Sequence, residues 1–131
     1  MSRDHLQPKS RVLMMPRDTN AAGTIFGGVI LSYIDQAGAE EAIWQGARRV
    51  VTVAMNQVVF QAPVYVGDLV SFYTELISVG RTSVTVKVLV KSARRFNRDE
   101  LVDVTKAEIT YVNVDENGRP VPISQPRGVE V

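Results

Sequence analysis

Asp35 is the side chain best suited to act as a base, because it lies inside a predicted helix among small and apolar residues. The residues three, four or seven positions away on its helix face are Gly28, Leu31, Ser32, Gly38, Ala39 and Ala42. This helix contains no lysine or arginine, and burial without a charged partner makes a carboxylate more basic. A lone helical aspartate is more often structural, so a second feature has to decide its role.

The second feature is a pair of glycines, Gly27 and Gly28, at the start of the same helix. The first N–H groups of a helix lack partners within it, and they suit an anion or a developing oxyanion. Gly28 and Asp35 are about two turns apart, an axial rise of about 10 Å. A carbonyl, an attacking water and the carboxylate would fit that distance. The spacing is compatible with hydrolysis of an acyl group, although a glycine pair is equally typical of tight helix packing.

Composition excludes several other chemistries. The 131 residues include no cysteine and a single histidine, His5, in a polar N-terminal stretch. A disulfide framework, a thiolate zinc site and a cysteine nucleophile are therefore excluded, and histidine-dependent chemistry has only this one residue. Neither the Gly-x-x-x-x-Gly-Lys-Ser/Thr pattern that binds nucleotide phosphates nor the Gly-x-Ser-x-Gly pattern of serine hydrolases occurs.

The elements that position these residues are one helix followed by strands. Helical patterning runs over about residues 28–46, with Gly46 as its stop, and Glu40 and Glu41 are expected to face water near that end. Strands are expected at residues 50–62, 69–79, 82–91 and 100–114. This order predicts the α+β class, with an antiparallel sheet covering the helix. Because the helix is apolar nearly all the way round, either the sheet wraps it or a second subunit covers the rest.

The charge is close to balanced, since fifteen Lys and Arg face fourteen Asp and Glu. Six basic residues nevertheless follow one another without an acid: Arg81, Lys87, Lys91, Arg94, Arg95 and Arg98. The strip is compatible with a small anionic ligand or an acidic partner, but the pattern alone favours a solvated strand face with an arginine-rich turn. No nucleic-acid partner is expected. The first ten residues lack the apolar run of a signal peptide and no window is long enough to span a membrane, so the cytoplasm is the expected location.

An ordered set of motifs resembles the acyl-CoA thioesterases of the hotdog fold, especially the bacterial YciA-type and brain-type acyl-CoA hydrolases. The set comprises DTNAAGTIFGG (18–28), Asp35, VT (51–52), FQAP (60–63), GD (67–68) and GRTS (80–83). It covers about residues 8–115. The resemblance implies a single hotdog domain over 1–131, with a five- or six-stranded antiparallel sheet round one long helix and a proline-containing tail at 116–131. It also implies homodimers with active sites at their interface, commonly three to a hexamer.

The resemblance implies acyl-CoA hydrolysis in fatty-acid metabolism, without a cofactor or metal. In the family's pattern Asp35 matches the carboxylate base, and Asn20 matches an asparagine that positions water or the thioester, usually from the facing subunit. Gly27 and Gly28 match the helix-start N–H donors that polarise the thioester carbonyl. The residues expected to bind coenzyme A are Gly80, Arg81, Thr82, Ser83, Arg94 and Arg95.

Several alternatives stay open at this point. Asp35 can direct a water molecule or can itself attack the thioester and form an anhydride. A non-enzymatic acyl-CoA binding or sensing module and a thioesterase for acyl carrier protein have the same motifs. A hotdog hydratase would need a histidine beside a carboxylate, and His5 is an unsuitable candidate.

Overall fold

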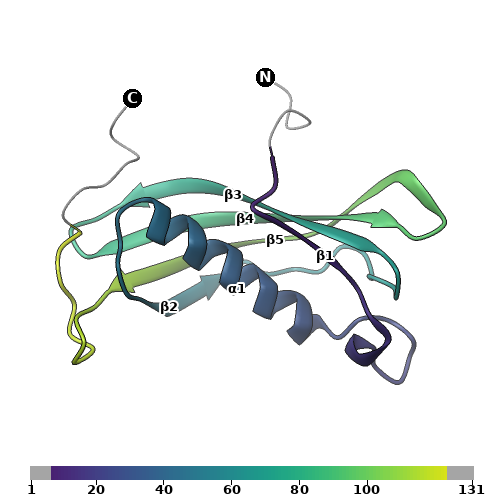
Figure 1. Cartoon of the computed structure of the whole chain (residues 1–131), viewed down its shortest axis with the longest axis horizontal. Helices are drawn as coiled ribbons and strands as arrows, with labels where there is room; N and C mark the ends of the chain where they lie inside the picture. The colour runs from purple at the N-terminus through teal and green to yellow at the C-terminus, as the bar shows by residue number, and fades with distance from the viewer. Residues whose placement is uncertain (1–6, 124–131) are drawn as a thin grey trace.

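The computed structural model describes residues 7–123, and in them one helix lies against one face of a five-stranded antiparallel sheet (Figure 1). The elements in chain order are β1 (Ser10–Leu13), the short 3-10 helix η2 (Pro16–Asp18), α1 (Gly27–Trp44), β2 (Val50–Asn56), β3 (Leu69–Val79), β4 (Ser83–Arg94) and β5 (Asn97–Asn113). The strands lie in the order β1-β3-β4-β5-β2. The expected α+β fold, one helix with one antiparallel sheet, is confirmed.

The alternation along β4 determines which face of the sheet meets the helix. Its four valines, at positions 84, 86, 88 and 90, are all buried in the core beneath α1. Residues between them, such as Lys87 and Lys91, point to the opposite face. Because side chains alternate strictly along a strand, a slip of one residue would place lysine in the core, so this register is strongly specified.

The sheet covers one side of α1. Ile30, Ile34, Ala37 and Ala42 are buried against it, whereas Ile43 and Trp44 remain 51% and 58% exposed. Gly46, with a φ of +114°, follows the helix as predicted and allows the chain to turn towards β2. An apolar helix that one sheet leaves partly exposed is consistent with the expected cover from a second subunit.

Three expected strand boundaries differ from the structure. β2 ends at Asn56 rather than at residue 62, because Gln57 adopts a left-handed φ of +59° and the chain leaves the sheet. β4 and β5 extend to Arg94 and back to Asn97, so the hairpin between them is tighter than the sequence pattern indicated. The short apolar segment near the N-terminus forms an edge strand, β1, paired with β3.

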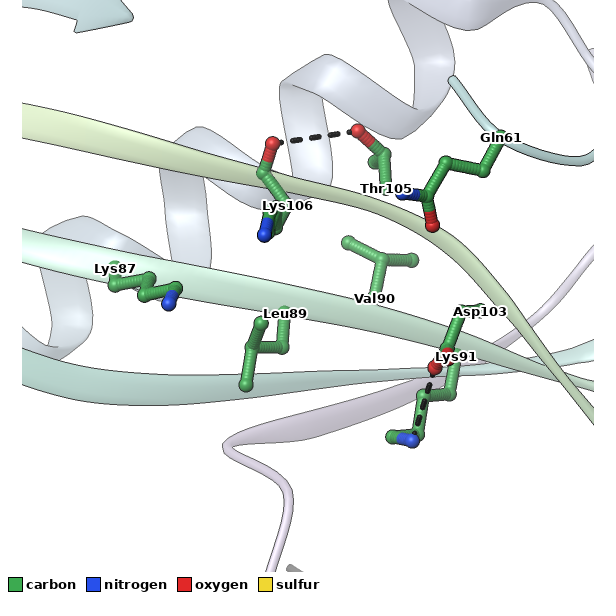
Figure 2. Close-up of a pocket in the computed structure, with 8 residues that line it drawn as sticks. All are labelled: Gln61, Lys87, Leu89, Val90, Lys91, Asp103, Thr105 and Lys106. Atoms are coloured by element: carbon green, nitrogen blue, oxygen red, sulfur yellow. Dashed lines mark hydrogen bonds and ion pairs between the residues drawn. The ribbon is translucent and has the colours of Figure 1, made fainter. Parts of the chain in front are cut away.

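The basic strip lies on the outer face of the sheet and at the turns at the two ends of β4. Lys91 Nζ lies 2.9 Å from Asp103 Oδ1, on the outer face that also carries Lys87 and Lys106 (Figure 2). Lys87 is opposite Glu75 on one side and Glu108 on the other. This arrangement favours the interpretation of a solvated strand face. No helix within residues 7–123 is long and apolar enough to cross a membrane.

Asp68 holds together the end of the sheet where the β4–β5 hairpin lies. Its carboxylate is 1% exposed and lies 2.8 Å from Arg94 Nη1. It also accepts hydrogen bonds from Ser92 Oγ and from the backbone N–H groups of Tyr65 and Arg95. A buried carboxylate with four donors is fully satisfied, so the loop before β3 is tied to the end of β4.

We expect Asp68→Asn to lower the free energy of unfolding by about 3 kcal/mol, because it removes the buried charge that pairs with the partly buried Arg94 guanidinium. Urea unfolding measures the loss. The matched control is Asp103→Asn, which breaks the exposed pair with Lys91 and should cost about 1 kcal/mol or less. Equal losses in the two variants would contradict a dominant role for burial.

Candidate active site

Asp35 lies two turns into α1 and has two hydroxyl partners from the sheet. Thr52 Oγ1, on β2, donates to Asp35 Oδ1 at 2.7 Å. The Tyr111 hydroxyl, on β5, lies 2.7 Å from the Asp35 carbonyl oxygen and 3.2 Å from Oδ1. Both partners are neutral hydroxyls, so among the described residues Asp35 has hydrogen-bond partners from the sheet but no charged partner. Within residues 7–123, Oδ2 accepts no hydrogen bond, so one oxygen is held and the other is open.

Tyr111 reaches Asp35 through the space at Gly38. A Cβ at position 38 would lie 2.2 Å from the Tyr111 hydroxyl and 3.0 Å from the ring, so no larger residue fits. Burial and the negative charge of Asp35 raise the pKa of Tyr111 far above its usual range. The phenol thus remains a neutral donor beneath the carboxylate. Gly38 therefore leaves room for the Tyr111 side chain next to Asp35.

The start of α1 leaves two donors open. Among residues 7–123, the N–H groups of Gly27 and Gly28 have no hydrogen-bond partner, and Phe26 at the N-cap provides none through its side chain. A Cβ added at Gly28 would meet nothing within 4 Å, whereas one added at Gly27 would lie 3.5 Å from the Phe60 ring. An apolar groove of about 280 Å³ opens here, between the helix start and the 60–64 segment. Free N–H groups beside an apolar groove can bind a carbonyl with an aliphatic chain attached.

Asn20 organises the loop that leads into the helix. Its Oδ1 accepts from the backbone N–H groups of Ala22 and Thr24, and its Nδ2 donates to Thr24 Oγ1. Gly23, with a φ of +89°, completes the turn. The amide is therefore held in place by its own loop, and one Nδ2 hydrogen is left for another group.

The residues expected to bind coenzyme A lie at opposite ends of the sheet. Gly80 to Ser83 form the β3–β4 turn, near the C-terminal segment, whereas Arg94 and Arg95 lie at the β4–β5 hairpin (Figure 1). The twelve residues of β4 separate them by about 36 Å. One chain alone does not bring the two groups together. In addition, Arg94 Nη1 already donates hydrogen bonds to the Asp68 carboxylate and to the Pro63 carbonyl.

Glu41 is a buried residue, which the sequence analysis placed in water. It accepts hydrogen bonds from Gln45 and Thr74, and its carboxylate lies 3.0 Å from Lys9 Nζ. Burial by itself raises the pKa of Glu41. The hydrogen bonds and the charge of Lys9 outweigh that effect and hold the pKa below its usual 4.5. Glu40, its exposed neighbour, faces water as expected.

Thr52 and Tyr111 are the partners of Asp35 that the sequence did not assign. Thr52 belongs to the VT motif (51–52), but nothing in the sequence of this apolar strand predicts a hydrogen bond from Thr52 to the helix. Tyr111 lies on a strand whose apolar and polar residues alternate, and an aromatic residue on the apolar face is usually part of the core. The described residues contain no group of three or more histidine, cysteine, aspartate or glutamate side chains that could hold a metal ion. His5 lies outside the described residues.

Comparisons with known proteins show the family to which this chain belongs. A sequence profile described as the thioesterase superfamily matches residues 22–95, which include the helix start, Asp35 and Thr52. The acyl-CoA thioester hydrolase YciA of Escherichia coli is 40% identical over 126 residues, covering 92% of this chain and 96% of that protein.

Solved structures are similar over the same length. A hexameric hotdog-fold thioesterase of Campylobacter jejuni has a TM-score of 0.86 and 46% identity, covering 93% of each chain. A hexameric broad-specificity acyl-coenzyme A thioesterase has a TM-score of 0.85 and 42% identity, covering 92% of this chain and 82% of that one.

The lowered pKa of Glu41 makes stability depend on acid pH. A carboxylate with a depressed folded pKa contributes stability above its unfolded value of about 4.5, and the contribution is lost as pH falls through the lower folded value. We expect Glu41→Gln to be less stable near neutral pH and to show a flatter fall in unfolding free energy below about pH 4.5. Glu40→Gln is the control and should follow the wild-type curve, and identical curves for all three proteins would contradict the prediction.

Proposed function

The chain belongs to the thioesterase superfamily, and from this premise we propose that it hydrolyses acyl-coenzyme A to a carboxylic acid and coenzyme A. The proposal depends on the Asp35 carboxylate, whose Oδ1 accepts hydrogen bonds while its Oδ2 accepts none from the described residues. This carboxylate lies about two turns from the open N–H groups at the helix start. The solved relatives named as acyl-coenzyme A thioesterases have the same fold at about 40% identity. The reaction is proposed to need no cofactor and to occur in the cytoplasm.

In the proposed reaction, the open Oδ2 of Asp35 takes a proton from water as the water oxygen attacks the thioester carbon. The carbonyl oxygen becomes an oxyanion and accepts from the N–H groups of Gly27 and Gly28. When the tetrahedral intermediate collapses, the carbon–sulfur bond breaks and the sulfur takes the proton from Asp35. The covalent alternative, in which Asp35 forms an anhydride that water then opens, uses the same oxygen.

The site is proposed to be completed by a second copy of the chain. Thr52, and with it Asp35, lies at β2, the edge strand of the sheet, where no other described segment covers it. Val51 and Val53 on the same strand are exposed. A facing subunit would close this edge and bring its Asn20 to Asp35. The solved relatives are described as hexameric, and we propose a homohexamer built from dimers.

Tyr111 and Thr52 are proposed as positioning residues for Asp35. Both hydroxyls contact Oδ1, so together they orient the carboxylate with Oδ2 free. Small errors in the position of a base reduce the rate strongly.

Release of free thiol from acyl-CoAs of increasing chain length tests the proposed function. Wild type should release coenzyme A, and Asp35→Asn should lower kcat by about a thousandfold or more while the fold is retained, because an amide cannot accept the proton. Ser32→Ala, one turn away on the same helix, is the control and should stay active. Binding of acyl-CoA without any hydrolysis by wild type would replace the enzyme with a binding module. Hydrolysis only of acyl carrier protein thioesters would change the substrate.

The positioning role predicts a separate effect for Tyr111→Phe. The ring is kept and the hydroxyl is lost, so kcat should fall about tenfold to a hundredfold while KM changes little. Tyr73→Phe, on the outer face of the sheet, controls for loss of a phenol. A rise in KM with unchanged kcat would show that Tyr111 acts on substrate binding instead.

A further inference from the structure

The turn between β4 and β5 consists of Arg95 and Phe96, and this composition is unusual for a hairpin. Two-residue hairpin turns favour glycine, asparagine and aspartate, because those residues adopt the backbone conformations that a tight turn requires. The Phe96 side chain is 89% exposed, more than any other large hydrophobic side chain of residues 7–123. The hairpin extends past the other strands at its end of the sheet (Figure 1). Burial within the described chain therefore does not account for an aromatic residue at this tip.

A hollow of about 480 Å³ adjoins the tip. Its lining includes Tyr65, Val66, residues 94–97 and Glu100. Tyr65 is 44% exposed, and the Arg94 guanidinium lies 5.0 Å from the centre of its ring. A protruding aromatic side chain and a hollow with an aromatic wall thus lie next to each other on one surface.

The base of the hairpin is held in place by a buried carboxylate. Asp68 accepts hydrogen bonds from the Arg94 guanidinium and from the Arg95 N–H, at 2.8 and 3.0 Å. The Arg95 guanidinium lies 4.8 Å from the centre of the Phe96 ring, close enough for a cation–π contact. Association costs less conformational entropy when the contacting side chains are already ordered. The tip is therefore well prepared to bind another protein surface.

The charges at the tip are balanced, so two copies of it would not repel each other. Besides the Arg94–Asp68 pair, residues 95–100 contain two basic and two acidic side chains. Within residues 7–123, neither Arg95 nor Glu100 forms an ion pair, and both line the hollow. A two-fold axis beside Phe96 would place Arg95 of each copy against Glu100 of the other copy. The surface is thus complementary to itself in charge as well as in shape.

The proposed homohexamer requires a contact of this kind. Its dimers are proposed to form at the β2 edge, and three dimers form a closed assembly only through a second contact between copies. β2 pairs with residues 108–113 of β5, so the tip of the hairpin lies beyond the end of β2. The tip is therefore a separate surface from the proposed dimer edge.

We infer that the hairpin tips of two dimers pack against each other, with Phe96 of each copy seated in the hollow of the other. The inference rests on the proposed homohexamer and is independent of the reaction. Because the knob and the hollow lie side by side, one two-fold axis fills both hollows at once. Arg95 and Glu100 of opposite copies then pair at the rim of the contact. Aromatic residues and arginine are enriched in interfaces between proteins.

The mass of the assembly in solution tests the inference, measured by sedimentation over a range of protein concentrations. Wild type should have the mass of six chains and Phe96→Asp that of two, because the contact would bury an unpaired carboxylate. Phe96 is exposed, so the variant should fold, and urea unfolding checks that its stability is retained. The control is Ile77→Asp, a half-exposed residue near the opposite end of β3, which should stay hexameric.

A charge exchange tests the geometry of the contact. Arg95→Glu and Glu100→Arg should each weaken the association of dimers about tenfold or more, because like charges would then face each other. The double variant Arg95→Glu/Glu100→Arg should restore the hexamer, since opposite charges meet again. A hairpin that had merely been damaged would not be rescued by the second substitution. A double variant that stays dimeric would contradict the proposed pairing.

A hexameric Phe96→Asp variant would overturn the inference, and so would a wild type that stays dimeric at every concentration. Release of thiol from acyl-CoA tests the proposed reaction separately. A wild-type hexamer that hydrolyses no acyl-CoA but dissociates on Phe96→Asp would reject the reaction and retain the contact between tips. An active wild type whose assembly is unaffected by Phe96→Asp would do the reverse.

Discussion

The contact between Gly38 and Tyr111 is the constraint on which the proposed active site depends. The hydroxyl of Tyr111 reaches the helix backbone only because position 38 has no Cβ, which would lie 2.2 Å away. That close approach lets a residue of β5 hold both the carbonyl and the carboxylate of Asp35. Close-packed interiors transmit such a constraint, since neither element can shift without displacing the other. The position of the proposed base is therefore set by the packing of α1 on the sheet.

The same packing explains why the site faces an edge. The sheet covers the side of α1 that carries Ile30 and Ile34, and Asp35 comes next along the chain, towards β2. As the last strand of the sheet, β2 has one side of its backbone unpaired. Exposed sheet edges pair readily with other chains. In the proposed assembly the carboxylate at this edge gains its remaining neighbours from a second subunit, and the solved relatives are described as hexameric.

Each end of the sheet contains a buried polar residue, and the two residues differ in charge: Asp68 is an acid and Asn113 is a neutral amide. Asp68 brings a carboxylate into the core and pairs with Arg94 at the hairpin end. Asn113 is neutral and uses its amide on backbone groups, and within residues 7–123 the exposed Arg48 and Arg49 form no ion pair. The difference follows from burying an acid at one end and an amide at the other.

The sequence by itself determined the elements and the main candidate residues. Alternating valines and an apolar helix beginning at a glycine pair are local patterns, so α1, β3 and β4 could be predicted closely, as could Asp35 as a candidate base. The ends of β2, the burial of Glu41 and the partners of Asp35 could not, because each depends on residues distant along the chain. Thr52 and Tyr111 are 17 and 76 positions from Asp35. Only tertiary structure decides which of the arginines form ion pairs, since pairing depends on distance in space.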